Sequence, residues 1–160
     1  MDHREQIIAA TEWCTHPADL AVERIRGTKN PDTAKIIGLK PDLVITNKEE
    51  NRELDVRRLR EAGVSVWVTD IESIDQSFAS MRRLWVEGLR AEVPEWLLEA
   101  EDVWAAPARE SGRRVACCIW RDPWMVVGRD TFTGDMLSRL GFDHVFATAD
   151  GRYPAVDLEE

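Results

Sequence analysis

The chain has 160 residues, of which 44% are hydrophobic, so it can bury one core or two small lobes. Thirty acidic residues against 21 basic ones give a net charge of −9, which repels nucleic acid and anionic lipid. No stretch approaches the roughly 18 apolar residues of a membrane span, and the first residues are charged where a signal peptide is apolar. Three cysteines cannot all pair internally, which favours free thiols and a reducing compartment.

The first 70 residues predict strands that alternate with helices. Asp32 or Thr33 can cap a short helix that stops before Pro41, and a second helix over residues 52–62 closes at Gly63. The predicted strands are residues 7–11, 43–46 and 64–70. Short connections between alternating strands and helices indicate a parallel sheet built from βαβ units.

Two successive helices then interrupt this alternation. Ile74, Phe78, Met81 and Trp85 fall at spacings of four, three and four, which predicts one face of a long helix over residues 73–89. A second helix starts at Pro94 and carries on one side Leu97, Ala100 and Trp104. We interpret the helices as the connection between two lobes.

The alternation resumes in the last third of the chain. A strand at 114–120, a turn at Asp122-Pro123, a strand at 124–128, a helix over 131–140 and a strand at 144–148 form a smaller α/β unit. The predicted divisions are therefore an N-terminal lobe at 1–72, connecting helices at 73–112 and a partial C-terminal lobe at 113–160.

The residues that follow each predicted strand are the candidates for a binding site, because ligands of parallel α/β sheets gather outside the carboxyl ends of the strands. Several of the seven tryptophans lie in such loops. Flat aromatic surfaces with a few charged groups suit a large, partly apolar small molecule.

Trp13, Cys14 and His16 follow the first predicted strand. They resemble a metal corner, but a zinc site needs three or four ligands, and His3 and His144 stand at no recognisable spacing. An exposed Trp13 that packs on a flat ligand is one alternative. A tryptophan in the hydrophobic core is the simplest interpretation from sequence alone.

Adjacent carboxylates at Glu49 and Glu50 follow the second predicted strand. Such a pair can act as general acid and base when burial separates the two pKa values. The alternative is a solvated helix start, where Glu49, Glu50 and Glu53 are favoured by the helix dipole. A charged contact with a ligand rim or a protein partner is a third interpretation.

The segment "GRDTFTGD", residues 128–135, lacks the motifs of a P-loop or a dinucleotide-binding turn. Thr131 or Thr133 is well placed to cap a helix, with Asp135 in its first turn. Free N–H groups at that helix start, beside Arg129, could also hold a carboxylate or amide of a ligand. No recognisable catalytic motif appears, so the sequence gives no support for an enzyme.

Several segments together carry a family resemblance. "TEWCTHPADL", "RGTKNPD", "IIGLKPDLVITNKEEN", "LREAGVSVWVTD", "CIWRDPWMVVGRDTFTGDMLSRLGFDHVFA" and "RYPAVDLEE" resemble the substrate-binding proteins of cobalamin and iron-chelate ABC importers, also called helical-backbone metal receptors. The "LKPDLVI" element and the order of the segments are specific, and the match covers nearly the whole chain.

The resemblance implies a class III periplasmic-binding-protein-like fold, in which two small parallel-sheet α/β lobes are joined by a long backbone helix. A cobalamin, siderophore or haem-like ligand would be held in the cleft between them, with the metal arriving inside its chelate and no intrinsic cofactor. The residues that would line the cleft are Trp13, Asn47, Glu49, Glu50, Trp120, Arg121, Trp124, Arg129, Asp130, Thr131, Phe132 and Tyr153. Glu49 or Glu50 would also dock onto arginines of an ABC transporter.

The chain departs from the family at both ends. Family members begin with an additional strand and helix and continue past "YPAVDLEE", so this chain resembles a receptor truncated at both termini. Exposed sheet edges then predict a homodimer, a rearrangement or weak binding. As given, the chain is expected in the cytoplasm, and it would be periplasmic if its N-terminus is not the natural one.

Three functions follow for testing. The first is a non-enzymatic binding module for a corrinoid or metal chelate, in which Arg121 and Arg129 meet peripheral carboxylates or amides. The second is a small-molecule enzyme that uses Glu49 or Glu50 with His16, which requires a buried carboxylate near the imidazole. The third is a domain with only a structural or oligomeric role.

Overall fold

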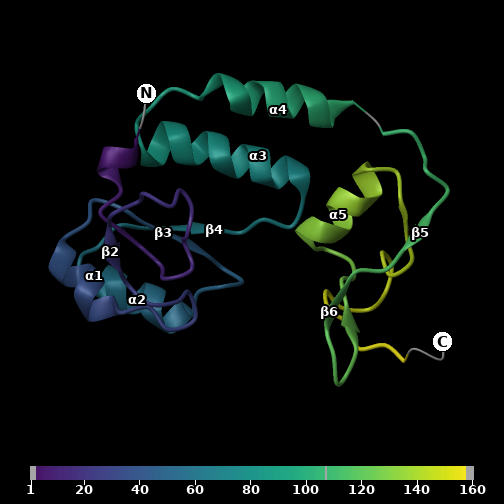
Figure 1. Cartoon of the computed structure of the whole chain (residues 1–160), viewed down its shortest axis with the longest axis horizontal. Coiled ribbons are helices and arrows are strands. Elements are labelled where there is room, and N and C mark those ends of the chain that lie inside the picture. The colour runs from purple at the N-terminus through teal and green to yellow at the C-terminus, as the bar shows by residue number, and fades with distance from the viewer. Residues whose placement is uncertain (1–2, 107, 158–160) are drawn as a thin grey trace. The chain divides into compact units, whose positions relative to one another are not determined.

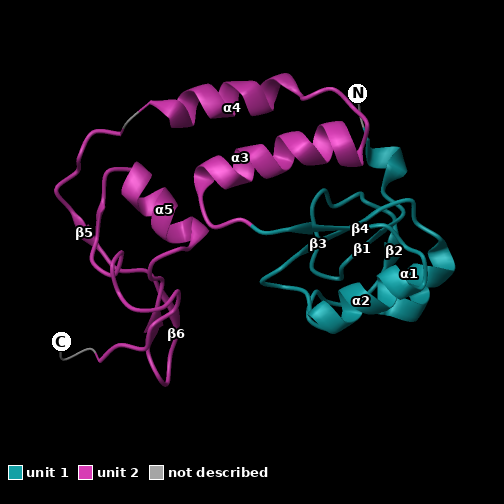
Figure 2. Cartoon of the chain, turned by 180° about the vertical axis from the view of Figure 1, so that it is seen from behind, with its two compact units in different colours: residues 1–70 teal, residues 71–160 magenta. Residues whose placement is uncertain are grey.

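The computed structural model describes residues 3–106 and 108–157. The chain divides into two compact units, residues 1–70 and 71–160, which are coloured separately in Figure 2. The finer three-part division expected from the sequence stays a prediction. None of the described helices is long and apolar enough to cross a membrane.

Unit 1 contains two parallel strand pairs and two helices (Figure 1). Strand β1 (Ala9–Ala10) pairs with β2 (Glu23–Arg24), and β3 (Val44–Asn47) pairs with β4 (Val66–Thr69). The helices are α1 (Thr33–Leu39) and α2 (Glu53–Glu61), and a short 3-10 helix, η1 (Arg4–Gln6), precedes β1. The predicted strands and helices of this unit are confirmed, whereas β2, which is only two polar residues long, was missed.

The ends of α1 and α2 follow from local chemistry. Asp32 caps α1 by accepting a hydrogen bond from the Lys35 N–H, and Lys40 ends the helix in the left-handed conformation at φ 50°. Gly63, at φ 83°, follows α2 and turns the chain towards β4. The predicted caps and stops are confirmed.

The core of unit 1 lies between its helices and its strands. Ile36, Leu59 and Val64 form a buried cluster, against which Val44 of β3 and Val66 of β4 pack. The helices α1 and α2 therefore cover one side of the β3–β4 pair, and Ile25, directly after β2, also contacts this cluster.

Unit 2 begins with helices. Helix α3 (Ile74–Arg83) is capped by Ser73 and continues into a π-helical turn, η2 (Leu84–Gly88), so the predicted helix over 73–89 is confirmed except for this wider last turn. Helix α4 (Glu95–Ala105) lies beside α3 (Figures 1 and 2). It buries Leu97 completely, and Arg82 of α3 forms an ion pair with Glu101.

The remainder of unit 2 is a small α/β arrangement. Strand β5 (Arg114–Val115) pairs in parallel with β8 (Asp143–His144), and β6 (Cys118–Trp120) pairs with β7 (Met125–Val126) in antiparallel orientation. Helix α5 (Phe132–Arg139) is capped by Thr131, whose side chain accepts a hydrogen bond from the Gly134 N–H. Asp135 in its first turn accepts from the Ile74 N–H, which attaches α5 to α3.

The predicted strands at 114–120 and 144–148 do not have the predicted lengths in the structure. Residues 114–120 split into β5 and β6 because each half pairs with a different strand. The turn at residues 121–124 is too short for a parallel crossover, so β6 and β7 form a hairpin. Of the expected strand at 144–148 only His144 is in a strand, because Ala147 and Ala149 donate to residues three before them and form turns.

Candidate functional site

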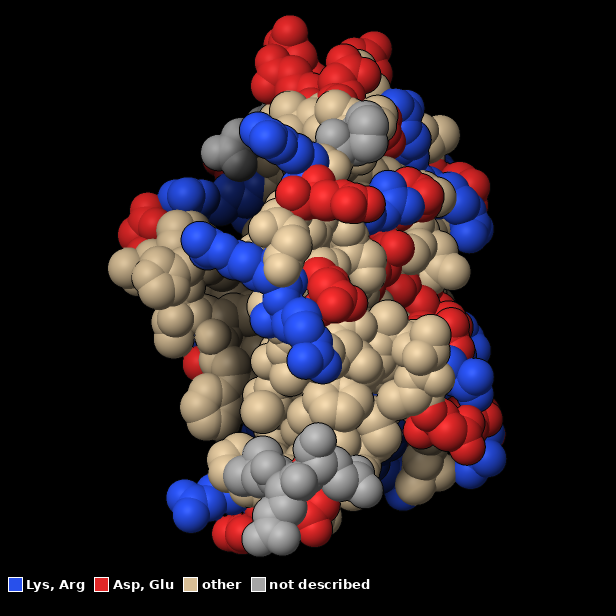
Figure 3. Space-filling view, turned by 90° about the vertical axis from the view of Figure 1, so that its right-hand side faces the viewer, with Lys and Arg blue, Asp and Glu red and all other residues tan. Residues whose placement is uncertain are grey.

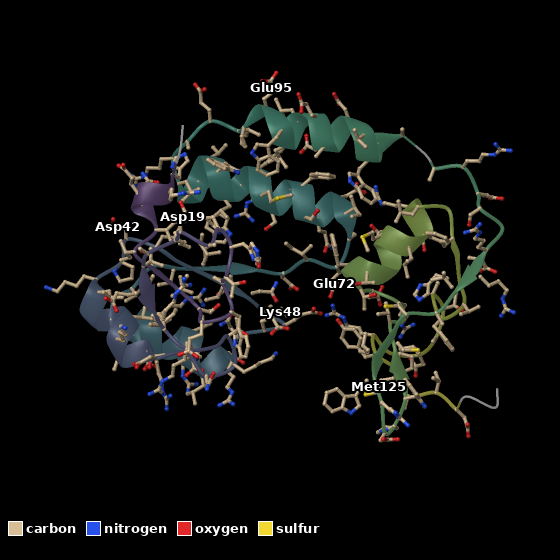
Figure 4. All side chains as sticks on the ribbon, in the orientation of Figure 1. Asp19, Asp42, Lys48, Glu72, Glu95 and Met125 are labelled. Carbon is tan, nitrogen blue, oxygen red and sulfur yellow. The ribbon has the colours of Figure 1, made fainter. Side chains whose placement is uncertain are left out.

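The loops that follow β1, β2 and β3 meet at one end of unit 1. The Asn51 side chain donates to the Thr28 carbonyl oxygen at 3.0 Å, and Lys29 Nζ lies 3.7 Å from the Glu50 carboxylate. The Lys48 ammonium, labelled in Figure 4, lies 2.6 Å from the Asp70 carboxylate and ties the loop after β3 to the end of β4. These bonds fix the positions of the carboxyl-end loops relative to one another.

Trp13 lies on the surface of this end. Its side chain is 79% exposed, so the interpretation of a core tryptophan is wrong. A Cβ atom added at Gly27 would lie 3.1 Å from Trp13 Nε1, which shows that the indole rests beside the loop after β2. Trp13 therefore presents a flat aromatic surface next to the carboxyl ends of the strands.

Asn47, at the end of β3, organises its own loop. Its Nδ2 donates to Thr69 Oγ1 at 3.1 Å, and its Oδ1 accepts from the N–H groups of Glu49 at 2.9 Å and Glu50 at 3.3 Å. The Asn47 amide thus holds the two glutamates in place from within the protein. A structural role explains this asparagine without a ligand.

Glu49 and Glu50 are exposed. The enzyme hypothesis required one of these carboxylates to be buried, and the structure does not meet that requirement. The solvated-helix-start interpretation fits better, because both residues lie in the turn before α2. Their exposure also leaves them accessible to a protein partner.

The β6–β7 hairpin of unit 2 carries an aromatic and cationic cluster. Trp120 is 64% exposed, and the Arg121 guanidinium stands over the Trp124 ring at 5.7 Å. Arg121 Nε also lies 3.9 Å from Asp122, in the turn that contains the Asp122-Pro123 peptide bond. Figure 4 labels Met125, which begins β7 directly after this cluster. The cation–π contact with Trp124 restricts the orientation of the arginine, and its contact with a ligand stays a prediction.

The loop between β7 and α5 contains three of the predicted site residues, and a fourth, Phe132, begins α5. Arg129 pairs with Asp150 at 3.1 Å and with Asp130 at 3.7 Å, and Phe132 is 36% exposed. Thr131 is only 3% exposed, and its hydroxyl donates to the Gly128 carbonyl while it accepts from the Gly134 N–H. The helix cap therefore accounts for Thr131.

The sequence did not predict two charged residues that lie beside this loop. Asp150 holds Arg129, and Arg152 pairs with Glu72 at 3.0 Å while its guanidinium lies 5.8 Å from the Tyr153 ring centre. The sequence signal that could have identified Arg152 is its position directly before Tyr153 in "GRYP". Figure 3, which shows the side of the molecule where α5 and β5 lie in Figure 1, has both basic and acidic side chains on a surface that is otherwise largely uncharged.

The scaffold behind this surface is held by charged hydrogen bonds. Arg139 of α5 binds both Asp75 and Asp135, and the hydrogen bond to Asp75 raises the pKa of the Arg139 guanidinium. Among residues 3–106 and 108–157 no cluster of three or more potential metal-ligating side chains occurs. The residues brought together in each unit are thus aromatic and charged surface groups.

Several solved structures are similar to this chain. The solved structures that match include BtuF, the periplasmic vitamin B12-binding protein of Vibrio cholerae, with a TM-score of 0.72 and 21% identity over 95% of this chain and 62% of that one. The periplasmic haem-binding protein RhuT from Roseiflexus sp. RS-1 matches with a TM-score of 0.78 and 21% identity over 97% of this chain and 64% of that one. The chain has the fold of these periplasmic receptors. The class III periplasmic-binding-protein-like fold predicted from the sequence is confirmed.

Sequence relatives agree with this fold. The vitamin B12-binding protein of Salmonella choleraesuis is 26% identical over 159 residues, which are 96% of this chain and 60% of the relative. That of Pectobacterium atrosepticum is 22% identical over 98% of this chain and 60% of the relative. No family model matches the chain. The resemblance to cobalamin- and iron-chelate-binding proteins is confirmed, and the chain spans about 60% of the length of these curated relatives.

Proposed function

We propose that the chain binds a corrinoid or another metal chelate and catalyses no reaction. The observation that carries this proposal is the hairpin cluster of Trp120, Arg121 and Trp124, in which Trp120 is exposed and the Arg121 guanidinium lies over the half-buried Trp124 ring. Indole faces can cover a flat ligand, while the guanidinium meets carboxylates or amides at its edge. The relatives are described as vitamin B12-binding and haem-binding proteins, which supports the same ligand class.

The proposal includes a second contact surface on unit 1. Trp13 exposes its indole beside the loop after β2, and Glu49 and Glu50 are exposed nearby. In the arrangement implied by the family resemblance, one ligand is held between the lobes. Substitutions at Trp13 and at Trp124 should then each weaken the binding of the same ligand, although they lie in different units.

A transport role and an extracytoplasmic location belong to the same proposal. The relatives include periplasmic binding proteins, and one matching structure is described as an ABC transporter substrate-binding protein. Exposed Glu49 or Glu50 would meet arginines of the transporter, because carboxylate–arginine pairs give orientation as well as attraction. Charge reversal at Glu50 should weaken docking to the transporter.

The test is a titration of the purified protein with cobalamin, haem and a ferric siderophore, followed by tryptophan fluorescence at a known oligomeric state. Saturable quenching by one chelate at a 1:1 ratio is the expected result. Flat titrations with all three would contradict the proposal. A flat result together with a homodimer would instead support the purely structural or oligomeric role.

A further inference from the structure

The arginine in the loop between β7 and α5 is already paired with carboxylates of this chain. Arg129 has two such neighbours: its Nη2 donates to Asp150 at 3.1 Å, and its Nε lies 3.7 Å from Asp130. One guanidinium beside two carboxylates gives this group of side chains a net negative charge. Arg129 therefore offers a ligand hydrogen-bond donors without an excess of positive charge.

Two further arginines of unit 2 are balanced in the same way. Arg121 Nε, above the Trp124 ring, lies 3.9 Å from Asp122. The Arg152 guanidinium lies 3.0 Å from Glu72, which is labelled in Figure 4. Each of these pairs is neutral as a whole, so neither arginine brings an uncompensated positive charge to a ligand.

The candidate loops of unit 1, considered by themselves, have the same charge balance. Lys29 Nζ lies 3.7 Å from the Glu50 carboxylate, and the Lys48 ammonium lies 2.6 Å from Asp70. Residues 48–53, which connect β3 to α2, contain two basic and three acidic side chains. The surface beside Trp13 is therefore also neutral or negative rather than basic.

Rearrangement of these exposed pairs would not change the local charge. An exposed ion pair is weak, so a ligand can draw a guanidinium away from its carboxylate. The released carboxylate nevertheless stays within a few ångströms, which is less than the roughly 8 Å over which physiological salt screens a charge. An anionic group of a ligand would then be repelled by that carboxylate.

We infer that these loops select a chelate with an uncharged or cationic periphery of amide or carbonyl oxygens and discriminate against peripheral carboxylates. This selectivity rests on the proposed function, because it specifies the ligand of the same site. A carbonyl oxygen accepts a hydrogen bond from a guanidinium that is already paired, since arginine has five N–H donors. A carboxylate meets the same donors together with the negative charges beside them, so repulsion sets the specificity. The net charge of −9 has the same sign and adds to the repulsion.

The test compares chelates of one scaffold that differ in peripheral charge. The three pairs of probes are cyanocobalamin and its monocarboxylic acid, formed by hydrolysis of one peripheral amide, haem dimethyl ester and haem, and N-acetyl and N-succinyl ferrioxamine B. Tryptophan fluorescence gives the dissociation constant of each. For the scaffold that binds, the form without carboxylates should bind at least about threefold more tightly for each carboxylate removed. Added salt should narrow this difference, because it screens the repulsion.

Two variants that remove the same charge separate local from overall effects. Asp150 is exposed beside Arg129, whereas Asp102 is exposed on α4, outside the candidate loops. Asp150→Asn leaves Arg129 with one carboxylate neighbour, and it should shift the ratio of the two affinities towards the carboxylate form by at least about threefold. Asp102→Asn changes the net charge equally and should retain the ratio.

The outcomes distinguish the selectivity from the proposed function. Equal or tighter binding of the carboxylate form would overturn the selectivity and leave chelate binding established. The same holds for an equal response of Asp150→Asn and Asp102→Asn, since the charges beside Arg129 would then not decide which form binds. Flat titrations with all of these chelates would overturn the proposed function, and the selectivity with it.

Discussion

His144 Nε2 lies 3.0 Å from the backbone oxygen of Val127, and both residues are buried. A carbonyl oxygen only accepts, so Nε2 is the ring nitrogen that carries the proton. This bond attaches β8 to the end of β7, immediately before Gly128 and the loop with Arg129 and Asp130. The position of the candidate binding loop therefore depends on a buried histidine outside that loop.

Replacement of this histidine tests that dependence. His144→Ala leaves the buried Val127 carbonyl without its donor, which should lower the free energy of unfolding by about 1–3 kcal/mol. Urea unfolding measures the loss, and the exposed His16→Ala change is the control, with an effect within about 0.5 kcal/mol. Equal stability of both variants would show that the bond contributes nothing to the fold.

Gly128 provides a second test of the same loop. A Cβ atom at this position would lie 2.6 Å from the Gly151 oxygen and 3.1 Å from the Arg152 oxygen, both in the backbone. Gly128→Ala should therefore destabilise unit 2, by about 1–3 kcal/mol. In contrast, Gly38 in α1 has no atom within 4 Å of an added Cβ, and Gly38→Ala should stabilise unit 1 by about 0.5–1 kcal/mol. Thermal unfolding should show a lower melting temperature for Gly128→Ala and a higher one for Gly38→Ala.

Local chemistry explains why some of this structure is predictable from sequence. Asp32 and Thr131 cap their helices because a short polar side chain at this position can accept a hydrogen bond from the free N–H three residues later. Such a residue directly before an apolar helical pattern is visible in the sequence. The split of residues 114–120 is not predictable in the same way, because it depends on pairing with β8, almost thirty residues later. Long-range pairing leaves no local signal.

The residues of the candidate site also differ in how far the sequence predicts them. The sequence predicts tryptophans in loops after strands, and Trp13 is exposed in the loop after β1, whereas Trp120 ends strand β6 and Trp124 is half-buried in the turn before β7. Asp150 and Arg152 were missed because their roles arise from contacts with Arg129 and Glu72, which are distant in the chain. Core or surface could not be decided for Trp13, since burial depends on which elements pack over it.

Trp124→Ala tests the hairpin as a ligand surface. Loss of the indole under Arg121 should weaken chelate binding by at least about 1 kcal/mol and leave the fold intact. Trp96→Ala is the matched control, because Trp96 is 54% exposed on α4, outside the candidate loops, and should leave affinity unchanged. Calorimetric titration measures both affinities. Unchanged affinity in Trp124→Ala would remove this residue from the site.

The cysteines should make no contribution to ligand binding. Cys14, Cys117 and Cys118 are free thiols, and the proposed ligand carries its own metal. We expect Cys117→Ser and Cys118→Ser to bind the same chelate with unchanged affinity and stoichiometry. Metal analysis of the isolated complexes checks this, and loss of bound metal in either variant would indicate a cysteine ligand.

The ion pair between α3 and α4 predicts a pH dependence of stability. The hydrogen bond from Arg82 lowers the pKa of Glu101 below its ordinary value of 4.5. The folded state therefore keeps this carboxylate ionised at pH values where the unfolded chain already binds a proton. Its contribution is complete above the ordinary pKa and is lost as the pH falls through the lowered value. Glu101→Gln should remove this part of the acid-induced loss of stability, while Glu99→Gln, on the exposed side of α4, should retain it. Urea unfolding between about pH 3 and 6 measures the two profiles, and identical profiles would show that the pair does not stabilise the contact between the helices.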